Sequence, residues 1–354
     1  MTDAKPDSGL TYAAAGVDLD ARHALVERFR EVAARSAAGR PEVLAGIGPF
    51  AGLFALGQYK EPVLVSSTDS VGTKVKLAAL VGRYESLGHD IVGHCVNDAF
   101  TTGADPLFFL DYIASAGLDD EAKVALVRGV ADACAAVNCA LLGGETADMP
   151  DVYAPGDLDL VGFVVGVAER SQLIDPSTIR EGDVLLALPS NGLHTNGYSL
   201  ARRALGIGRD AASAASDRAK LERHVPELNE TLADALLRAH HCYYHELKPA
   251  VPYLKGMAHI TGGGLEENLP RILPDGLGAV IDKRAMSVPP IFTHIQKAGS
   301  IDADEMYRVF NMGFGMVLAV APENADRLRQ IAAGARAVGE VTAITAGEAR
   351  VRWR

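Results

Sequence analysis

The sequence is poor in cysteine and has no long apolar run, and each shortage excludes a class of protein. Only four of its 354 residues are cysteines, none in the C-x-x-C spacing of a metal or redox motif. Because these cysteines sit among apolar neighbours, we expect reduced, mostly buried thiols in a cytoplasmic protein. No apolar run approaches the ~20 residues that span a bilayer. The N-terminus has no basic segment followed by an apolar one, so we expect neither a membrane anchor nor a signal peptide.

Basic residues are also in short supply. The chain has 34 Lys and Arg against 45 Asp and Glu, a net charge of −11. This balance argues against non-specific nucleic-acid binding, since nucleic-acid phosphates would be repelled. The net charge does not exclude a small anionic substrate, because local cationic sites and Mg²⁺ decide whether such a substrate binds. The G-x-x-x-x-G-K-[ST] spacing of a Walker A loop is absent as well.

The length and the 48% hydrophobic content predict two conventional cores. We place the boundary in the polar connection 169–183, giving an N-terminal domain 1–174 and a C-terminal domain 175–354. Neither half shows clean βαβ repetition, so we expect an α+β protein of two α/β domains, the second with a mixed sheet and flanking helices. The periodicities predict helices at 20–38, 90–102, 119–137, 197–205 and 230–247, strands at 63–68, 107–114, 139–142, 158–167, 184–188, 278–281 and 312–320, and a surface loop at 210–220.

One strand runs directly into a turn of small residues that carries Asp69, Gly72, Thr73 and Lys74. A helical pattern follows, so the turn offers free backbone N–H groups beside a lysine, which suits a phosphate. A carboxylate in the same turn suits the Mg²⁺ that accompanies a nucleotide. The alternative is an ordinary strand-to-helix connection with a solvated Asp and Lys, and this segment alone favours that alternative.

Two further carboxylates stand in comparable places. Asp98 lies in a predicted helix beside Asn97, and Glu145 follows Gly143 and Gly144 at the predicted end of a strand. If the strands are neighbours, Asp69 and Glu145 could converge at one edge of a sheet. Oxygen ligands of this kind suit Mg²⁺ rather than Zn²⁺. The alternative for each is a surface acid or a helix cap.

Two segments in the second half place polar side chains between glycines. The first carries His194 and Asn196 after a strand, and the second carries His259 and Thr261 before a glycine triplet. A histidine in such a turn can act as acid, base or donor near neutral pH. A tight turn with a helix cap and a hydrogen-bonded histidine explains the pattern equally well. The triplet offers backbone amides to an anion and consists of Gly262, Gly263 and Gly264.

A third histidine group lies in the predicted helix 230–247. His241 and His245 have the i, i+4 spacing that can hold a metal, with His240 beside them. No H-E-x-x-H pattern accompanies them, so we expect a solvated helix face instead.

Together these segments resemble the phosphoribosylformylglycinamidine cyclo-ligase family, also called aminoimidazole ribonucleotide synthetases. The order and spacing of the segments over most of the chain carry the resemblance. They are the residues at 12–18, 40–43, 66–74, 95–98, 106–112, 143–146, 191–199, 258–268 and 306–316.

The resemblance implies an enzyme of de novo purine synthesis that closes formylglycinamidine ribonucleotide to aminoimidazole ribonucleotide at the expense of ATP. It implies ATP and Mg²⁺ as cofactors and a homodimer whose N-terminal sheets pair, with no nucleic-acid or membrane partner. Asp69, Asp98 and Glu145 would hold Mg²⁺, Asp69 taking a catalytic part as well. Lys74 would contact ATP phosphates. The remaining implied contacts are Gly72, Thr73, Asn97, Asp111, Gly143 and Gly144 for the nucleotide, His194 and His259 for catalysis, and Asn196, Thr261 and Gly262 to Gly264 for the substrate.

The chain departs from the family pattern at several positions. Ser70 stands where glycine is usual, which would strain the turn if that position needs a positive φ. Asn191 replaces a serine, and the usual Pro and Arg near Ala239 and His241 are missing. These departures keep open a non-catalytic, nucleotide-sensing paralogue.

Two relatives of the same architecture fit less well. A selenophosphate synthetase would need a reactive cysteine near its N-terminus, and none precedes Cys95. A hydrogenase maturation protein would end in cysteine, whereas this chain ends in Arg354.

Overall fold

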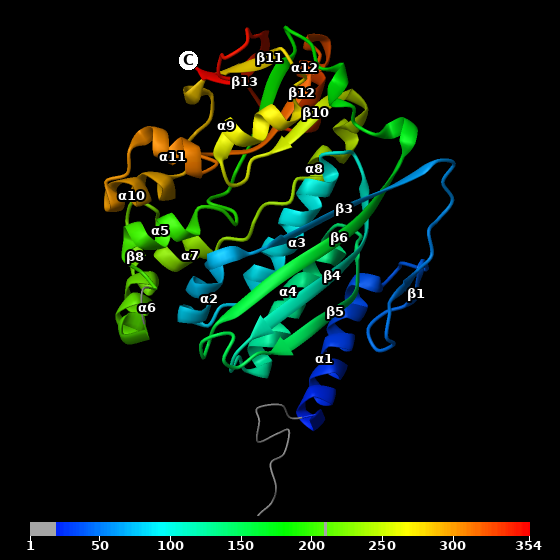
Figure 1. Ribbon diagram of the computed structural model, residues 1–354, viewed down its shortest axis with the longest axis vertical. Coiled ribbons are helices and arrows are strands. Elements are labelled where there is room, and N and C mark those ends of the chain that lie inside the picture. The colour runs from blue at the N-terminus through cyan, green and yellow to red at the C-terminus, as the bar shows by residue number, and fades with distance from the viewer. Residues whose placement is uncertain (1–18, 209–210) are drawn as a thin grey trace, which may run out of the picture.

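The computed structural model describes residues 19–208 and 211–354, and it contains two mixed β-sheets, each with its own helices (Figure 1). The first sheet lies before residue 170 and the second after residue 183. This is the α+β architecture that the sequence predicts. The family segment at 12–18 and the start of the predicted loop at 210–220 lie outside the described residues. Within the described ranges, no helix is long and apolar enough to cross a bilayer.

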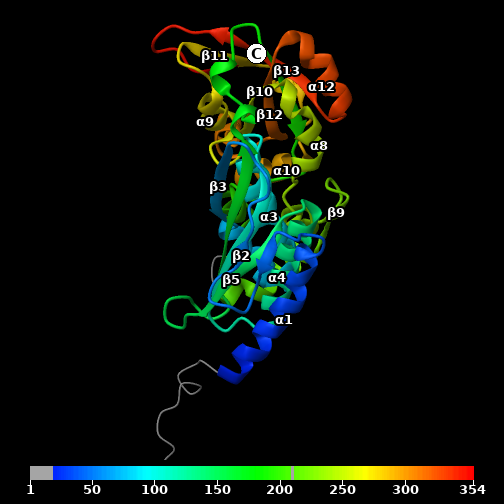
Figure 2. The same cartoon turned by 90° about the vertical axis from the view of Figure 1, so that its right-hand side faces the viewer.

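The N-terminal sheet has four strands in the order β3-β6-β4-β5. Its β4–β5 pair is parallel and its other pairs are antiparallel. Helices α1, α3 and α4 cover one face, and no helix of the described residues covers the other face (Figure 2). The strands are β3 (Pro62–Ser70), β4 (Asp105–Ser115), β5 (Ala140–Asp148) and β6 (Leu158–Glu169), and the helices are α1 (Leu19–Ala37), α3 (Glu85–Phe100) and α4 (Asp120–Ala136).

Glycine allows α3 and α4 to pack at close range. A Cβ atom added at Gly129 would lie 2.0 Å from the backbone oxygen of Glu85, and one at Gly88 would lie 2.3 Å from the backbone nitrogen of Val130. Asp119 caps α4, because its side chain accepts a hydrogen bond from the backbone N–H of Ala122. The position of α3 over the sheet is therefore set by backbone-to-backbone contact, and α3 carries several of the site residues.

The C-terminal sheet has six strands in the order β10-β12-β7-β13-β11-β14. Its interior strand β12 is buried along its whole length, as its continuous apolar run predicts. The β11–β14 pair is parallel, so the sheet is mixed. The strands are β7 (Val184–Pro189), β10 (Leu254–His259), β11 (Leu277–Ile281), β12 (Phe314–Val320), β13 (Arg336–Ala343) and β14 (Val351–Trp353).

The two halves meet where α6 and α7 of the second pack against α2 of the first (Figure 1). The remaining helices are α2 (Val75–Val81), α5 (Tyr198–Leu205), α6 (Ala214–Glu222), α7 (Leu232–Leu237), α8 (Tyr244–Leu247), α9 (Gly264–Asn268), α10 (Pro290–Gly299), α11 (Ala303–Val309) and α12 (Ala325–Ile331). Short strand pairs are formed by β1 (Val43–Ala45) with β2 (Leu53–Phe54) and by β8 (His224–Val225) with β9 (Glu230–Thr231).

Most predicted elements are confirmed, but two are wrong. The predicted helix 230–247 is broken into α7 and α8, because the backbone turns extended at Arg238 and its carbonyl accepts a hydrogen bond from Lys74. The predicted loop contains α6, which buries Leu221. The thiols are unpaired as expected, three of them buried and Cys242 partly buried.

Candidate functional site

Four residues form a row across the N-terminal sheet and set the geometry of the site. Asp69 on β3 pairs with Gly162 on β6, Gly162 with Asp111 on β4, and Asp111 with Gly144 on β5. Residues in such a row point to the same face, and two strand spacings separate Asp69 from Asp111 by roughly 10 Å. Because β3 and β5 are the two edge strands, Asp69 and Glu145 do not meet within one chain. The expectation that they converge is thus corrected by the strand order.

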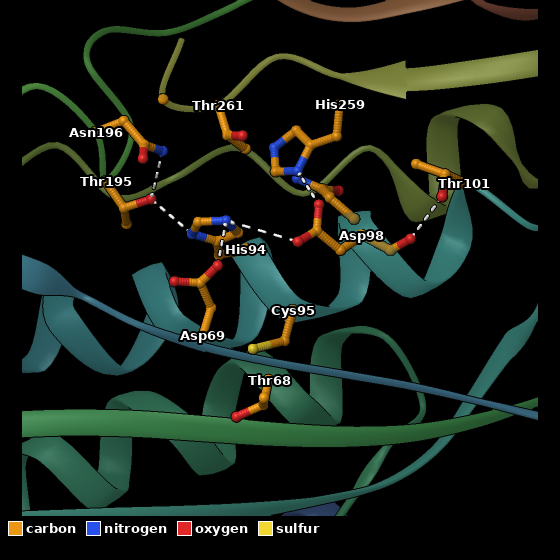
Figure 3. Close-up of polar contacts among 12 residues, drawn as sticks. Thr68, Asp69, His94, Cys95, Asp98, Thr101, Thr195, Asn196, His259 and Thr261 are labelled. Carbon is orange, nitrogen blue, oxygen red and sulfur yellow. Dashed lines mark hydrogen bonds and ion pairs between the residues drawn. The ribbon is translucent and has the colours of Figure 1, made fainter. Parts of the chain in front are cut away.

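Asp69 instead meets Asp98 around His94 (Figure 3). The Nε2 atom of His94 lies 3.0 Å from one carboxylate oxygen of Asp69 and 3.7 Å from one of Asp98. His94 and Asp98 are four residues apart on α3, which places both on one helix face. The Nδ1 atom of His94 lies 2.8 Å from the Thr195 hydroxyl, which belongs to the other domain.

The C-terminal domain contributes three more histidines to this cluster. His259, at the end of β10, binds Asp98 through Nδ1 at 2.7 Å, and its Nε2 lies 3.0 Å from Nε2 of His240. His194 stacks on His240 with ring centroids 4.0 Å apart. All three side chains are buried. We call His94, His194, His240 and His259 the histidine cluster.

The environment raises the pKa of one histidine of the cluster and lowers the pKa of the other three. Burial opposes protonation of His94, but its hydrogen bond to Asp69 and the charges of Asp69 and Asp98 outweigh burial and raise its pKa. Burial lowers the pKa of His259, and lowers that of His194 and of His240 strongly. Burial also opposes ionisation of Asp98, yet its contacts with His259 and His94 hold its pKa below the usual value.

Asp69 and Asp98 fit a divalent cation such as Mg²⁺. Their carboxylates converge on the Nε2 atom of His94, and two carboxylates at one place offer the oxygen ligands that such an ion prefers. Both side chains are about one third exposed, so an ion could reach them from solvent. Glu145, on the far edge strand, does not fit the same ion within one chain.

Lys74 does not lie where a phosphate contact would need it. Its side chain is fully buried, its ammonium group lies 2.8 Å from Asp90, and it donates to the backbone carbonyls of His194 and Arg238. Burial lowers the pKa of Lys74 and raises that of Asp90. In this structure the lysine ties the two domains together.

Asn97 also joins the two domains through hydrogen bonds. Its amide donates to the backbone oxygen of His241, and its side-chain oxygen accepts from the backbone N–H of Tyr243. Both polar atoms of the side chain are therefore used between α3 and the segment that joins α7 to α8. Its predicted place in the nucleotide site finds no support in these contacts.

The predicted substrate contacts lie on two loops beside the histidine cluster. Asn196 donates to Thr195, and its side chain lies close to Gly262. The turn Gly263–Gly264 has positive φ angles, and Asn268 supports it by donating to the backbone carbonyls of Gly262 and Gly264. Thr261 lies beside His259 and Asn196 in Figure 3.

The predicted nucleotide turn contains Gly72 and Thr73, which stay near this region. Gly72 has a φ of 63°, and the Thr73 hydroxyl lies 3.1 Å from that of Ser199. Ser70 pairs with Val161 inside β3 and has no positive φ. The condition for strain at Ser70, a positive φ, is therefore not met.

The other predicted residues line a separate cleft of about 1500 Å³ at the β5 edge. Asp111, Gly143, Gly144 and Glu145 line it, together with the glycine-rich segment 46–52. One carboxylate oxygen of Asp111 has no hydrogen-bond partner among the described residues, and burial raises its pKa to about 7.

Sequence reasoning missed several residues around the histidine cluster and in the cleft at the β5 edge. In the cleft, Lys123 of α4 is buried and lies 2.9 Å from Asp148. A lysine on the apolar face of the predicted helix 119–137 was the available signal. His94 and Thr195 gave no signal of their own, because the packing of α3 on β3 brings His94 to Asp69 and the packing of the domains brings Thr195 to His94.

The comparisons with known proteins agree with this architecture. Residues 51–168 match the N-terminal domain of AIR synthase related proteins, and residues 180–352 match their C-terminal domain. Solved structures share the fold at 18% identity. One is the hydrogenase maturation protein HypE in complex with ATP, with a TM-score of 0.63 over 94% of this chain and 91% of that one. Another is a thiamine-monophosphate kinase from Stenotrophomonas maltophilia, with a TM-score of 0.60 over 93% and 95%.

Two curated relatives narrow the class. Proteins named phosphoribosylformylglycinamidine cyclo-ligase are 49% identical over 329 residues in Xanthomonas oryzae pv. oryzae (91% of this chain, 92% of the relative) and 48% identical over 322 residues in Desulfitobacterium hafniense (90% and 91%). The fold and its two matched domains make the chain an AIR synthase related protein. Within that class, it belongs to the phosphoribosylformylglycinamidine cyclo-ligase family.

Proposed function

We propose that the protein catalyses the ATP-dependent ring closure of formylglycinamidine ribonucleotide to aminoimidazole ribonucleotide, with release of ADP and phosphate, in de novo purine synthesis. The names of relatives at 49% identity support this reaction. A solved structure of the same fold contains ATP, which supports ATP as the phosphoryl donor. A nucleotide-sensing paralogue is less well supported, because the relatives are named as ligases.

The single observation that carries the site is the convergence of Asp69 and Asp98 on His94, with His259 of the other domain bound to Asp98. An amide oxygen is a poor leaving group, so the reaction needs a phosphoryl group on that oxygen before the amidine nitrogen attacks the carbon and phosphate departs. Mg²⁺ held by Asp69 and Asp98 would supply neutralisation of phosphate charge.

The chain's own residues would position the substrate and stabilise developing charge. His259 is oriented by Asp98 and lies beside His94, and His194 stacks on His240 in the same cluster. Neutral imidazoles can donate to or accept from the reacting amide and amidine. Asn196, Thr261 and the glycine turn would hold the ribonucleotide beside them. Positioning of this kind, together with charge neutralisation, would supply most of the acceleration.

The test is Asp69→Asn, which keeps the size and removes the charge. We expect turnover to fall by roughly 100-fold or more, as for the loss of one preorganised electrostatic group, with the circular dichroism spectrum unchanged. ADP and aminoimidazole product are measured together. Asp326 on α12, whose side chain is 84% exposed, gives a matched control, Asp326→Asn. Near-normal turnover in Asp69→Asn would remove that carboxylate from the site.

We further infer that the protein is a cytoplasmic homodimer in which the open face of the N-terminal sheet pairs with a second copy. Leu64 and Phe163 lie on that face and are 62% and 38% exposed. Large apolar side chains on an uncovered sheet face are typical of an interface. Light scattering on Leu64→Glu should show monomers, whereas a monomeric wild type would contradict the dimer.

A further inference from the structure

We propose that His194, His240 and His259 form a binding site for Zn²⁺, separate from the Mg²⁺ ligands Asp69 and Asp98. One ring nitrogen of each histidine lies within 4.8 Å of the others. Three imidazoles with an open fourth position are a common zinc coordination set, whereas Mg²⁺ prefers oxygen ligands. The two metals are therefore distinguished by ligand chemistry.

Zinc binding requires only modest shifts of the three ring nitrogens. Zn–N bonds of 2.0–2.1 Å place tetrahedral ligand nitrogens about 3.4 Å apart. The Nε2 atoms of His240 and His259 are already 3.0 Å apart. Two facing ring nitrogens with one proton between them become two metal ligands when that proton leaves.

The supporting contacts behind the ligands are present as well. The other nitrogen of His259 binds Asp98 at 2.7 Å, and the other nitrogen of His240 lies 3.4 Å from the Thr195 hydroxyl. Metal-bound histidines characteristically use their second nitrogen in this way, because the contact fixes the ring and its tautomer. The two contacts leave Nε2 of both rings directed at the site.

His194 supplies the third ligand and the strongest single indication. It is 2% exposed, and neither ring nitrogen has a hydrogen-bond partner among the described residues. Its backbone has a φ of 62°, a conformation that non-glycine residues adopt at a cost. Its ring stacks on His240, so it must turn about χ2 to direct a nitrogen at the metal. That turn breaks no hydrogen bond, and χ2 of histidine is a broad torsion.

Zinc at this site would occupy two imidazoles that the proposed reaction needs. We therefore expect Zn²⁺ to inhibit turnover in the presence of excess Mg²⁺. This consequence rests on the proposed function, whereas the metal site itself does not. The two are tested by separate measurements.

The test titrates Co²⁺, and then Zn²⁺, into chelator-treated full-length protein. One equivalent of Co²⁺ per chain should give the intense visible absorption of tetrahedral cobalt, and Zn²⁺ should abolish it. His240→Gln should weaken binding by more than about tenfold, since loss of even a supporting contact costs that much. His241→Gln is the matched control, because this neighbouring side chain is 44% exposed and lies outside the site.

A wild-type spectrum without the tetrahedral bands would overturn the proposal, whatever the variants do. So would a His240→Gln protein, folded by circular dichroism, that binds Co²⁺ as the wild type does. Absence of turnover without zinc would count against the proposed reaction only. Turnover that Zn²⁺ leaves unchanged, alongside the cobalt bands, would overturn the inhibition and keep the site.

Discussion

Replacement of Lys74 by methionine separates two explanations of that residue. The sequence predicts a phosphate contact, whereas the structure places the ammonium group in a fully buried pair with Asp90. Lys74→Met would leave the Asp90 carboxylate buried with only the backbone N–H of His240 as a partner. It would also remove the donor to two carbonyls of the other domain.

Breaking a buried pair in this way costs about 3–5 kcal/mol. We expect a loss of that size in the free energy of unfolding, measured by urea denaturation. Adding Asp90→Leu removes the stranded charge and should recover much of the loss. The control is Arg83→Met, because its pair with Asp234 also joins the domains but is exposed and should contribute about 0–1 kcal/mol.

The two explanations give opposite results in a nucleotide-binding assay. If Lys74 only ties the domains, Lys74→Met measured well below its denaturation midpoint should retain ATP affinity. A variant as stable as the wild type that no longer binds ATP would refute the structural role and restore the phosphate contact.

Two further predictions concern stability. Gly129→Ala should destabilise the protein by roughly 1–3 kcal/mol, despite the better helix propensity of alanine, because its Cβ would meet the Glu85 carbonyl; Gly46→Ala, which has open space, should shift the thermal midpoint little. Asp111 has a folded pKa of about 7, above the ordinary value of ~3.9, so its stabilising contribution is complete below about pH 4 and is lost as the pH rises through 7. Asp111→Asn should therefore be more stable than the wild type by roughly 1–3 kcal/mol at pH 8 and equal to it at pH 4. A urea-denaturation difference that is the same at both pH values would contradict the raised pKa.

The local elements were predictable because each is encoded in a short window. The alternating residues of β3 and the 3.6-residue period of α1 and α4 needed no tertiary information. The site was less predictable, because it depends on strand order. Asp69 and Glu145 look alike in sequence, yet two strands separate them.

The histidine cluster shows the same limit. His240 was assigned to a solvated helix, but that helix ends where the Arg238 carbonyl turns to Lys74. A lysine is usually exposed, so nothing near Lys74 predicts that it enters the core to meet Asp90. Lys74, whose hydrogen bond to Arg238 ends the helix before His240, lies 164 positions away from Arg238 in the chain.

The side-chain hydrogen bonds that join the two domains affect which substitutions this sequence can accept. Lys74, Asp90 and Asn97 all hold the segment 238–243 through its peptide groups, and none of these ties depends on which side chains the segment carries. Substitutions at Ala239 or His241 can therefore accumulate without changing how the domains are oriented. The missing Pro and Arg at these positions become a permitted variation, and the segment can acquire a new chemical group, such as the imidazole of His240, while the architecture around it stays constant.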